Sequence, residues 1–439
     1  MVTNSNGNFE KFKRIHFVGT GGIGVSAIAR MCLLEGKRVT GSDRAPSEIT
    51  DELIKLGAKI TFGQQGVSEI PKDTDLIIYT AAIEVAEPTL LSEIKKLSIP
   101  SLSYSEALGE ISKDKYTVAI AGTHGKTTTT GMVATALIDA GLSPTVIIGS
   151  ILNREKSNFV FGKSDVLVVE ADEYRRSFLS LSPKILVINN LDLDHLDYFK
   201  DLKDIQSAYA ELANKVPKDG FIITDFSDPN VAPVLESAKA TVLDYRSADV
   251  TGLSLPVPGE HNIKNAQVTL TVGAVLGIPR EKICEALKNF QGTWRRFEKV
   301  GTMKSDALVY DDYAHNPQKI SALIASAREF FPGKKLTVVF QPHLYSRTKT
   351  LFSGFVEALS KADRIIVADI FPAREPFDSS ISSKMLADAI VAQNKNVSYF
   401  QSFDAIVQEL KKSARADDVV ITVGAGDIYK IGGELVKGL

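Results

Sequence analysis

The chain has 439 residues, of which 44% are hydrophobic and 24% are charged. Its 51 basic and 53 acidic side chains nearly cancel, so no basic excess points to nucleic acid as a partner. The polar first residues lack the apolar core of a secretory signal, and no stretch approaches the roughly 20 consecutive apolar residues of a membrane helix. We therefore expect a cytoplasmic protein without a nucleic-acid or membrane partner. The length predicts several domains, at about 100 to 200 residues each.

Short runs rich in Val, Ile and Leu alternate with longer helical patterns, which is typical of βαβ units in parallel sheets. The clearest runs predict strands buried on both faces, at residues 14–18, 75–80, 116–122, 166–172, 184–190, 336–340, 364–369 and 418–424. The fold class we expect is α/β with mainly parallel sheets. Breaks in the pattern predict three domains, at residues 1–105, 106–296 and 297–439.

A glycine-rich loop, HFVGTGGIG at residues 16–24, follows the first predicted strand and opens a helical pattern. Glycine permits a tight turn and lets backbone N–H groups approach a phosphate, and the helix N-terminus adds about half a positive charge. Asp43 ends the next predicted strand, where an acid binds the ribose of a dinucleotide. We expect a nucleotide diphosphate here, although a turn that only packs a helix on its sheet gives the same pattern. The residues concerned are Gly19, Gly21, Gly22, Ile23, Gly24 and Asp43.

A second loop, AGTHGKTTTT at residues 121–130, also connects a predicted strand to a helix. Only Thr123 and His124 separate its two glycines, so the loop is shorter than the usual P-loop. Lys126 can still reach phosphate oxygens, and the Thr127 hydroxyl can bind Mg²⁺. We expect ATP and Mg²⁺, with a capped helix start as the alternative. The predicted ATP-binding residues of this loop are Gly122, Thr123, His124, Gly125, Lys126, Thr127 and Thr128.

Polar side chains follow two further predicted strands, where ligands of a parallel sheet bind. The first strand is followed by Glu170, Asp172 and Glu173, and the second by Asn189, Asn190, Asp192, Asp194, His195 and Asp197. Oxygen ligands suit Mg²⁺, so these acids predict a metal platform, with solvated loop charges as the alternative. The residues alone leave His195 open between metal ligation and orienting a carboxylate.

Four later motifs carry further candidate residues. GEHNIKNA offers Asn262 and Asn265, spaced either to bond a planar ring such as adenine or to cap a helix. TWRRF offers Arg295 and Arg296, which could neutralise a transferring phosphoryl group or be a plain surface pair. DDYAHNP and FQPHLYSRT again end strands, and they add Asp312, His315, His343 and Arg347.

In this order the motifs resemble the Mur ligases of bacterial peptidoglycan synthesis, over about residues 16–430. The resemblance implies a Rossmann-like N-terminal domain that holds the UDP of a sugar nucleotide, a central P-loop ATPase domain and a Rossmann-like C-terminal domain. It implies that Lys126 and Thr127 hold ATP and Mg²⁺, and that Glu170 and His195 bind a second Mg²⁺. Asn262 and Asn265 would face adenine, and Arg296 and Asp312 would contact ATP phosphate and ribose. The implied catalytic residues are Lys126, His195, Arg296, His315 and Arg347, of which His315 and Arg347 help to place the amino acid.

The implied reaction is ATP-dependent joining of L-alanine to the lactyl carboxylate of UDP-N-acetylmuramate, through an acyl phosphate, in cell wall synthesis. Leu344 stands where many relatives carry arginine, and Asn316 where a second histidine is common. Both lie near the expected amino-acid pocket, so a murein tripeptide in place of L-alanine stays open. A nicotinamide-dependent oxidoreductase is an alternative from another class, but it leaves the second loop unexplained. The sequence does not determine the oligomeric state.

Overall fold

The computed structural model describes residues 9–63, 65–195, 198–373, 375–393 and 396–437, so Asp197 of the acidic segment lies outside the described residues. The chain forms two compact units. The first contains the described residues up to 255 together with 263–291, and the second contains 256–262 together with those from 292 onward. Among the described helices, none has the length and apolarity to cross a membrane.

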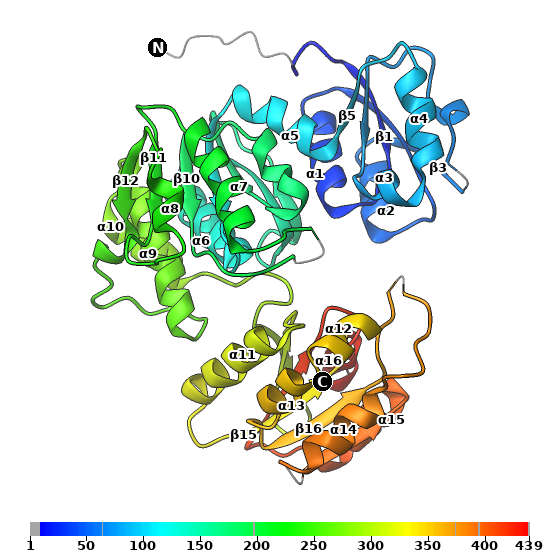
Figure 1. Cartoon of the computed structure of the whole chain (residues 1–439), viewed down its shortest axis with the longest axis vertical. Helices are drawn as coiled ribbons and strands as arrows, with labels where there is room; N and C mark the ends of the chain where they lie inside the picture. Colours follow the sequence, from blue (N-terminus) through cyan, green and yellow to red (C-terminus); the bar gives the residue numbers. More distant parts are fainter. Residues whose placement is uncertain (1–8, 64, 196–197, 374, 394–395, 438–439) are drawn as a thin grey trace. The chain divides into compact units, whose positions relative to one another are not determined.

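The first unit begins with a five-stranded parallel sheet in the order β3-β2-β1-β4-β5 (Figure 1). β1 is the central strand, and its Ile15 and Phe17 are fully buried in the core. β2 and β4 lie on opposite sides of β1, so the strand order reverses at β1, and the carboxyl end of such a strand is where ligands of open α/β sheets bind. The elements are β1 (Arg14–Val18), α1 (Ile23–Leu34), β2 (Arg38–Asp43), α2 (Glu48–Lys55), β3 (Lys59–Phe62), the 3-10 helix η1 (Val67–Glu69), β4 (Leu76–Tyr79), α3 (Ala82–Ala86), α4 (Pro88–Lys96), β5 (Ser101–Ser103) and α5 (Tyr104–Lys113).

A second sheet of this unit has seven strands in the order β12-β11-β10-β6-β9-β7-β8. β8 pairs antiparallel with β7, and the remaining pairs are parallel. β6 lies between β10 and β9, so the loop after β6 is flanked by the carboxyl ends of both strands. The elements are β6 (Tyr116–Ala121), α6 (Lys126–Asp139), β7 (Thr145–Leu152), β8 (Ser157–Val160), β9 (Val166–Glu170), η2 (Tyr174–Ser180), β10 (Ile185–Ile188), α7 (Leu202–Lys215), β11 (Phe221–Thr224), α8 (Ala232–Leu235), β12 (Thr241–Asp244), η3 (Tyr245–Ser247), α9 (Glu260–Val275) and α10 (Arg280–Lys288).

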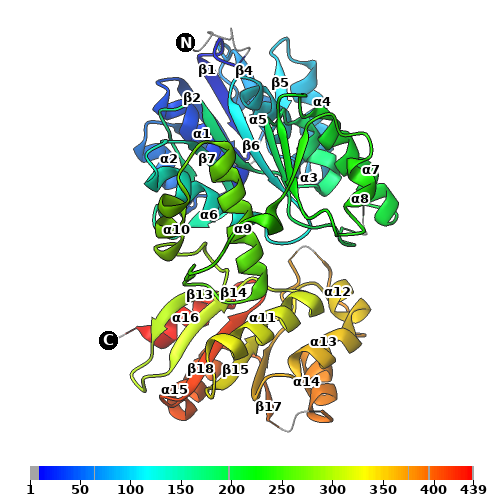
Figure 2. The ribbon, with the colours of Figure 1, turned by 90° about the vertical axis from the view of Figure 1, so that its left-hand side faces the viewer.

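The second unit contains a six-stranded sheet in the order β13-β14-β18-β15-β16-β17, in which β13 alone is antiparallel to its neighbour. Helices α11, α13 and α14 cover one face of this sheet, and α15 and α16 cover the other (Figure 2). The elements are β13 (Glu298–Thr302), β14 (Leu308–Asp312), α11 (Pro317–Phe330), β15 (Lys335–Phe340), α12 (Tyr345–Thr350), α13 (Phe352–Leu359), β16 (Arg364–Ala368), α14 (Ser383–Val391), β17 (Val397–Phe400), α15 (Phe403–Ser413), β18 (Asp418–Val423) and α16 (Tyr429–Val436).

These sheets confirm the α/β fold class and each of the strands expected from the apolar runs. The strands β10 and β16 show why: all four residues of β10, and four of the five residues of β16, are buried, as strands covered on both faces must be. The expected domain boundaries near residues 105 and 296 stay predictions, because the first two sheets share one compact unit.

Candidate active site

The loop between β6 and α6 presents a row of unpaired backbone donors. Gly125 caps α6 with a left-handed backbone, φ 80°. The N–H groups of Gly125, Lys126, Thr127 and Thr128 have no hydrogen-bond partner within the part of the chain that the structure describes. Free N–H groups at a helix N-terminus, together with the helix dipole, form an anion site. The shortened loop therefore keeps the geometry that holds phosphates.

Two asparagines at the end of β10 hold this loop in place. The backbone N–H of His124 donates to Asn190 Oδ1 at 2.9 Å, and Asn189 Nδ2 donates to the His124 carbonyl at 3.2 Å. The Gly122 N–H donates to the buried Tyr209 hydroxyl at 3.1 Å. Sequence reasoning placed both asparagines on a metal platform and did not find their role as loop supports. The feature that could have revealed this role is the position of the two asparagines directly after β10, the strand beside β6.

Asn265 lies beneath the same loop. It is 5% exposed, and its Oδ1 accepts a hydrogen bond from Thr129 Oγ1 at 2.9 Å. Asn262 is equally buried, and its Nδ2 donates to the Pro258 carbonyl at 2.6 Å. Asn265 therefore supports helix α6 in this structure. The expected contact of the two asparagines with adenine stays a prediction.

Lys126 is paired with Glu173, one of the acids expected on the metal platform, and this pairing was not predicted from the sequence. Its Nζ lies 2.7 Å from Glu173 Oε2, and it donates to the Gly122 carbonyl at 2.6 Å. The two side chains are 14% and 3% exposed. Burial alone lowers the pKa of Lys126, but attraction to Glu173 and the neighbouring acids raises it above its usual value. The ammonium group thus carries its charge, with Glu173 as counterion.

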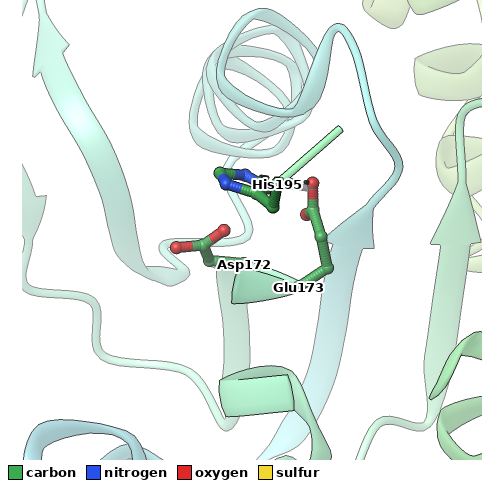
Figure 3. A group of neighbouring side chains, drawn as sticks. All are labelled: Asp172, Glu173 and His195. Carbon is green, nitrogen blue, oxygen red and sulfur yellow. Dashed lines mark ion pairs between the residues drawn. The ribbon is translucent and has the colours of Figure 1, made fainter. Parts of the chain in front are cut away.

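Hydroxyl, carboxylate and imidazole groups next to this pair fit a divalent cation. Thr127 Oγ1 donates to Glu170 Oε1 at 2.7 Å, and the other Glu170 oxygen accepts from the Gly149 N–H. Potential ligand atoms of Asp172, Glu173 and His195 lie within 4.8 Å of one another (Figure 3).

His195 Nε2 lies 3.8 Å from Glu173 Oε1. The expected pairing of His195 with Glu170 stays a prediction, while the structure groups His195 with Asp172 and Glu173. Carboxylate oxygens are the ligands Mg²⁺ prefers, so the donor set suits that ion.

The first glycine loop is held by the acid that we expected to bind ribose. Gly19 makes the turn with φ 75°, and the Gly21 N–H donates to Asp43 Oδ2 at 2.6 Å. The N–H groups of Ile23 and Gly24, in the first turn of α1, have no partner among the described residues. The loop therefore offers a small anion site at the carboxyl end of β1. Its assignment to UDP stays a prediction.

In the second unit the adjacent arginines Arg295 and Arg296 have different roles. Arg295 is 3% exposed and bonds Asp311 Oδ2 at 2.8 Å and the Gly424 and Gly426 carbonyls at 2.5 and 2.7 Å. All three nitrogens of its guanidinium are thus engaged within the second unit, so Arg295 stabilises the fold. Arg296 instead lies over the Tyr313 ring, 5.3 Å from its centroid. The surface-pair alternative therefore fails for Arg295.

Three sequence-predicted residues of the second unit lie near one another. Burial, together with the positive charges of Lys319, Arg347 and Arg296, lowers the pKa of His315 to about 3. His315 Nδ1 is 2.9 Å from the Tyr313 carbonyl, which can only accept, so Nδ1 carries the hydrogen and Nε2 is an acceptor. Arg347 contacts His343 Nδ1 at 3.1 Å.

The structure also places Asp312 and the two residues that differ from many relatives, Asn316 and Leu344. Asp312 accepts hydrogen bonds from the Phe297 and Ala314 N–H groups, both at 2.8 Å, and burial raises its pKa. Asn316 is the N-cap of α11 and accepts from the Lys319 N–H, a role that asparagine fills well. Leu344 has φ 71°, a strained backbone for a branched residue.

The parallel α/β sheets and the free N–H groups at the start of α6 are typical of α/β proteins that bind nucleotides. Three family models match the chain: the Mur ligase family catalytic domain at residues 14–116, the Mur ligase middle domain at 120–251, and the Mur ligase glutamate ligase domain at 295–426. The UDP-N-acetylmuramate–L-alanine ligase of Caldanaerobacter subterraneus subsp. tengcongensis is 40% identical, over 98% of both chains. The ligase of the same name from Clostridium kluyveri is also 40% identical, over 97% of this chain and 98% of its own.

A crystal structure of the UDP-N-acetylmuramate-alanine ligase of Thermotoga maritima superimposes with a TM-score of 0.79 at 30% identity. The match covers 95% of this chain and 97% of that one. The chain belongs to the Mur ligase family, and its fold is the three-domain α/β fold of that family.

Proposed function

We propose that this protein is an ADP-forming ligase that joins L-alanine to the lactyl carboxylate of UDP-N-acetylmuramate, a step in making peptidoglycan precursors. The observation that carries the proposal is the row of free N–H groups from Gly125 to Thr128 beside the buried Lys126. That arrangement suits the β- and γ-phosphates of ATP. The relatives that are 40% identical over nearly the whole chain carry the name of this activity.

ATP is needed because a free carboxylate is a poor acyl donor in neutral water. A lactyl carboxylate oxygen attacks the γ-phosphorus, and the bond from that phosphorus to ADP breaks. The amine nitrogen of L-alanine then attacks the carbonyl carbon of the acyl phosphate, phosphate leaves, and the nitrogen loses a proton. Lys126 supplies positive charge to the phosphoryl oxygens, which relieves their crowding during transfer.

The pairing of Glu173 with Lys126 affects how ATP binds in this scheme. In the absence of nucleotide Glu173 neutralises the buried Lys126, so a triphosphate has to compete with it for the ammonium group. Mg²⁺, held by Thr127 and Glu170 with a second ion at Asp172, Glu173 and His195, would screen the negative charge of the phosphates when bound.

We place UDP-N-acetylmuramate at the first glycine loop and L-alanine beside Arg347 and His315 in the second unit. The first glycine loop, with Gly19 to Gly24 and Asp43, holds the UDP diphosphate at the start of α1. In the second unit, Arg347 pairs with the L-alanine carboxylate, and neutral His315 accepts a hydrogen bond from the amine through Nε2. Arg296 and Asp312 are the proposed contacts to ATP phosphate and ribose. The cell compartment that supplies ATP and these precursors is the cytoplasm.

The alternatives are weaker. A murein tripeptide in place of L-alanine is not favoured, because the relatives at 40% identity over nearly the full chain are L-alanine ligases. Asn316 does not argue for the tripeptide either, since helix capping accounts for it. A nicotinamide-dependent oxidoreductase is excluded by membership of a ligase family.

The test is a complete reaction with stoichiometry. The protein is incubated with UDP-N-acetylmuramate, L-alanine and Mg-ATP, while ADP is followed by a coupled assay and the product by mass spectrometry. We expect one ADP for each UDP-N-acetylmuramoyl-L-alanine formed, and no comparable rate with a murein tripeptide. ADP release that is indifferent to the sugar nucleotide would refute the proposal.

A pair of lysine variants provides the matched control for this reaction. Lys126→Ala should lower turnover by about a thousandfold, because positive charge on the phosphoryl oxygens is lost. Lys163→Ala removes an exposed lysine of the same unit and should leave turnover unchanged. Equal turnover in the two variants would contradict the role given to the P-loop.

A further inference from the structure

Tyr104, the first residue of α5, lies against the first turn of α1. A Cβ at Gly24 would lie 2.6 Å from Tyr104 Cζ and 2.9 Å from both Cε atoms. The ring carbon that bears the hydroxyl is therefore the nearest atom to Gly24. The absence of a side chain at Gly24 makes room for this ring, and the expected approach of a phosphate to its backbone stays a prediction. The Tyr104 hydroxyl thus lies beside the first glycine loop.

The position of Tyr104 is fixed by its neighbours. Ser103 and Glu106 form a reciprocal capping pair at the start of α5, with the Ser103 N–H donating to Glu106 Oε2 at 2.7 Å. Helix α5 packs against α1, β4 and β5 of the first sheet and against β6 and η2 of the second. Tyr104 therefore stands where the two sheets of the first unit meet, on an element that both hold rigidly.

The Tyr104 hydroxyl is free of hydrogen bonds to the described part of the chain. Its ring is only partly exposed. Burial, and then the charges of Glu170 and Asp172, raise the pKa of the phenol far above its usual range. The phenol is thus neutral and able to donate a hydrogen bond. A half-buried donor without a partner is a group that a bound substrate can satisfy.

The proposed substrate has to pass this point. Its diphosphate binds at the start of α1, and its carboxylate has to reach the γ-phosphate near Lys126. The N-acetylmuramoyl sugar joins these two ends, so it occupies the space beside Tyr104. We propose that the Tyr104 hydroxyl donates a hydrogen bond to the N-acetylmuramoyl group and so positions the lactyl carboxylate for phosphorylation. This inference rests on the proposed function.

The test compares two ligands in Tyr104→Phe, which keeps the ring against Gly24 and removes only the hydroxyl. Calorimetry measures binding of UDP-N-acetylmuramate and of UDP alone, without ATP or amino acid. We expect affinity for UDP-N-acetylmuramate to fall about fivefold to tenfold, the usual worth of one hydrogen bond, and affinity for UDP to stay unchanged. Tyr116→Phe, at the opposite end of β6 from the P-loop, should change neither affinity.

The outcomes separate the claims. Unchanged binding of both ligands by Tyr104→Phe would overturn the inference. An equal loss for both would also overturn it, because the ring would then support the loop and not the sugar. Circular dichroism and the melting temperature establish that the variant folds. If the unaltered protein binds neither UDP nor UDP-N-acetylmuramate, the proposed function fails first, and this inference with it.

Discussion

Replacing Glu173 with glutamine tests how the P-loop lysine is held without nucleotide. The substitution keeps the shape of the side chain and one acceptor oxygen, but it leaves the Lys126 ammonium buried without its counterion, because the pair is 14% and 3% exposed. Removing one partner of a buried ion pair costs about 3–5 kcal/mol, and the retained acceptor places this case near 3 kcal/mol. A triphosphate restores the missing negative charge. We therefore expect a nonhydrolysable ATP analogue to bind the variant tighter, by up to about a hundredfold.

Urea unfolding in EDTA, with and without the analogue, measures both effects. Circular dichroism follows the whole chain, while the fluorescence of the only tryptophan, Trp294, reports the second unit and should shift less. Glu211→Gln is the matched control, since its carboxylate is 57% exposed and lies 3.8 Å from Arg176. Such an exposed pair contributes about 0–1 kcal/mol. A cost for Glu173→Gln no larger than that of the control, or a cost that nucleotide does not reduce, would refute the reasoning.

Three further predictions concern other parts of the molecule. His16 is 1% exposed, and burial lowers its pKa to about 4. As the pH falls below about 6.5, this histidine is protonated in the unfolded chain but stays neutral in the folded chain. Between pH 8 and pH 5 this histidine should therefore cost about 2 kcal/mol of unfolding free energy, a loss that His16→Asn removes; a pH dependence identical in the variant would contradict this. Arg347→Lys should raise the KM for L-alanine about tenfold or more in steady-state kinetics, because lysine lacks the planar fork; an unchanged KM would argue against the carboxylate contact. Asn189→Ala removes the bonds to the His124 carbonyl and to Thr129 Oγ1, and should raise the KM for ATP about tenfold with the KM for L-alanine unaltered, whereas a matching rise in both would point to general unfolding.

The parts of the fold that sequence predicted are those set by local pattern. The apolar runs that became β1, β6 and β10 are buried on both faces, so their composition carries the signal. The loop at Gly122 to Thr127 was equally clear, because its glycines and lysine are adjacent in sequence. The shortened spacing still gives a strand, a loop and a helix whose first turn carries free backbone donors, and the binding of ATP there stays a prediction.

The parts that sequence missed depend on neighbours in space. Glu173 was quoted only as one acid among several, and its pairing with Lys126 arises because β9 lies beside β6. Arg295 and Arg296 are adjacent and identical in type, yet only the first is buried, because it bonds Asp311 on β14. Likewise, nothing near Gly24 in sequence reveals that Tyr104 fills the space beside it.

The central claim is that the lactyl carboxylate takes the γ-phosphoryl group of ATP before the amine attacks. The most direct measurement uses UDP-N-acetylmuramate with ¹⁸O in both carboxylate oxygens, and mass spectrometry of the phosphate released in the complete reaction. The account requires one ¹⁸O atom in each phosphate formed and one retained in the new amide. Phosphate that carries no label, with product still accumulating, would contradict it.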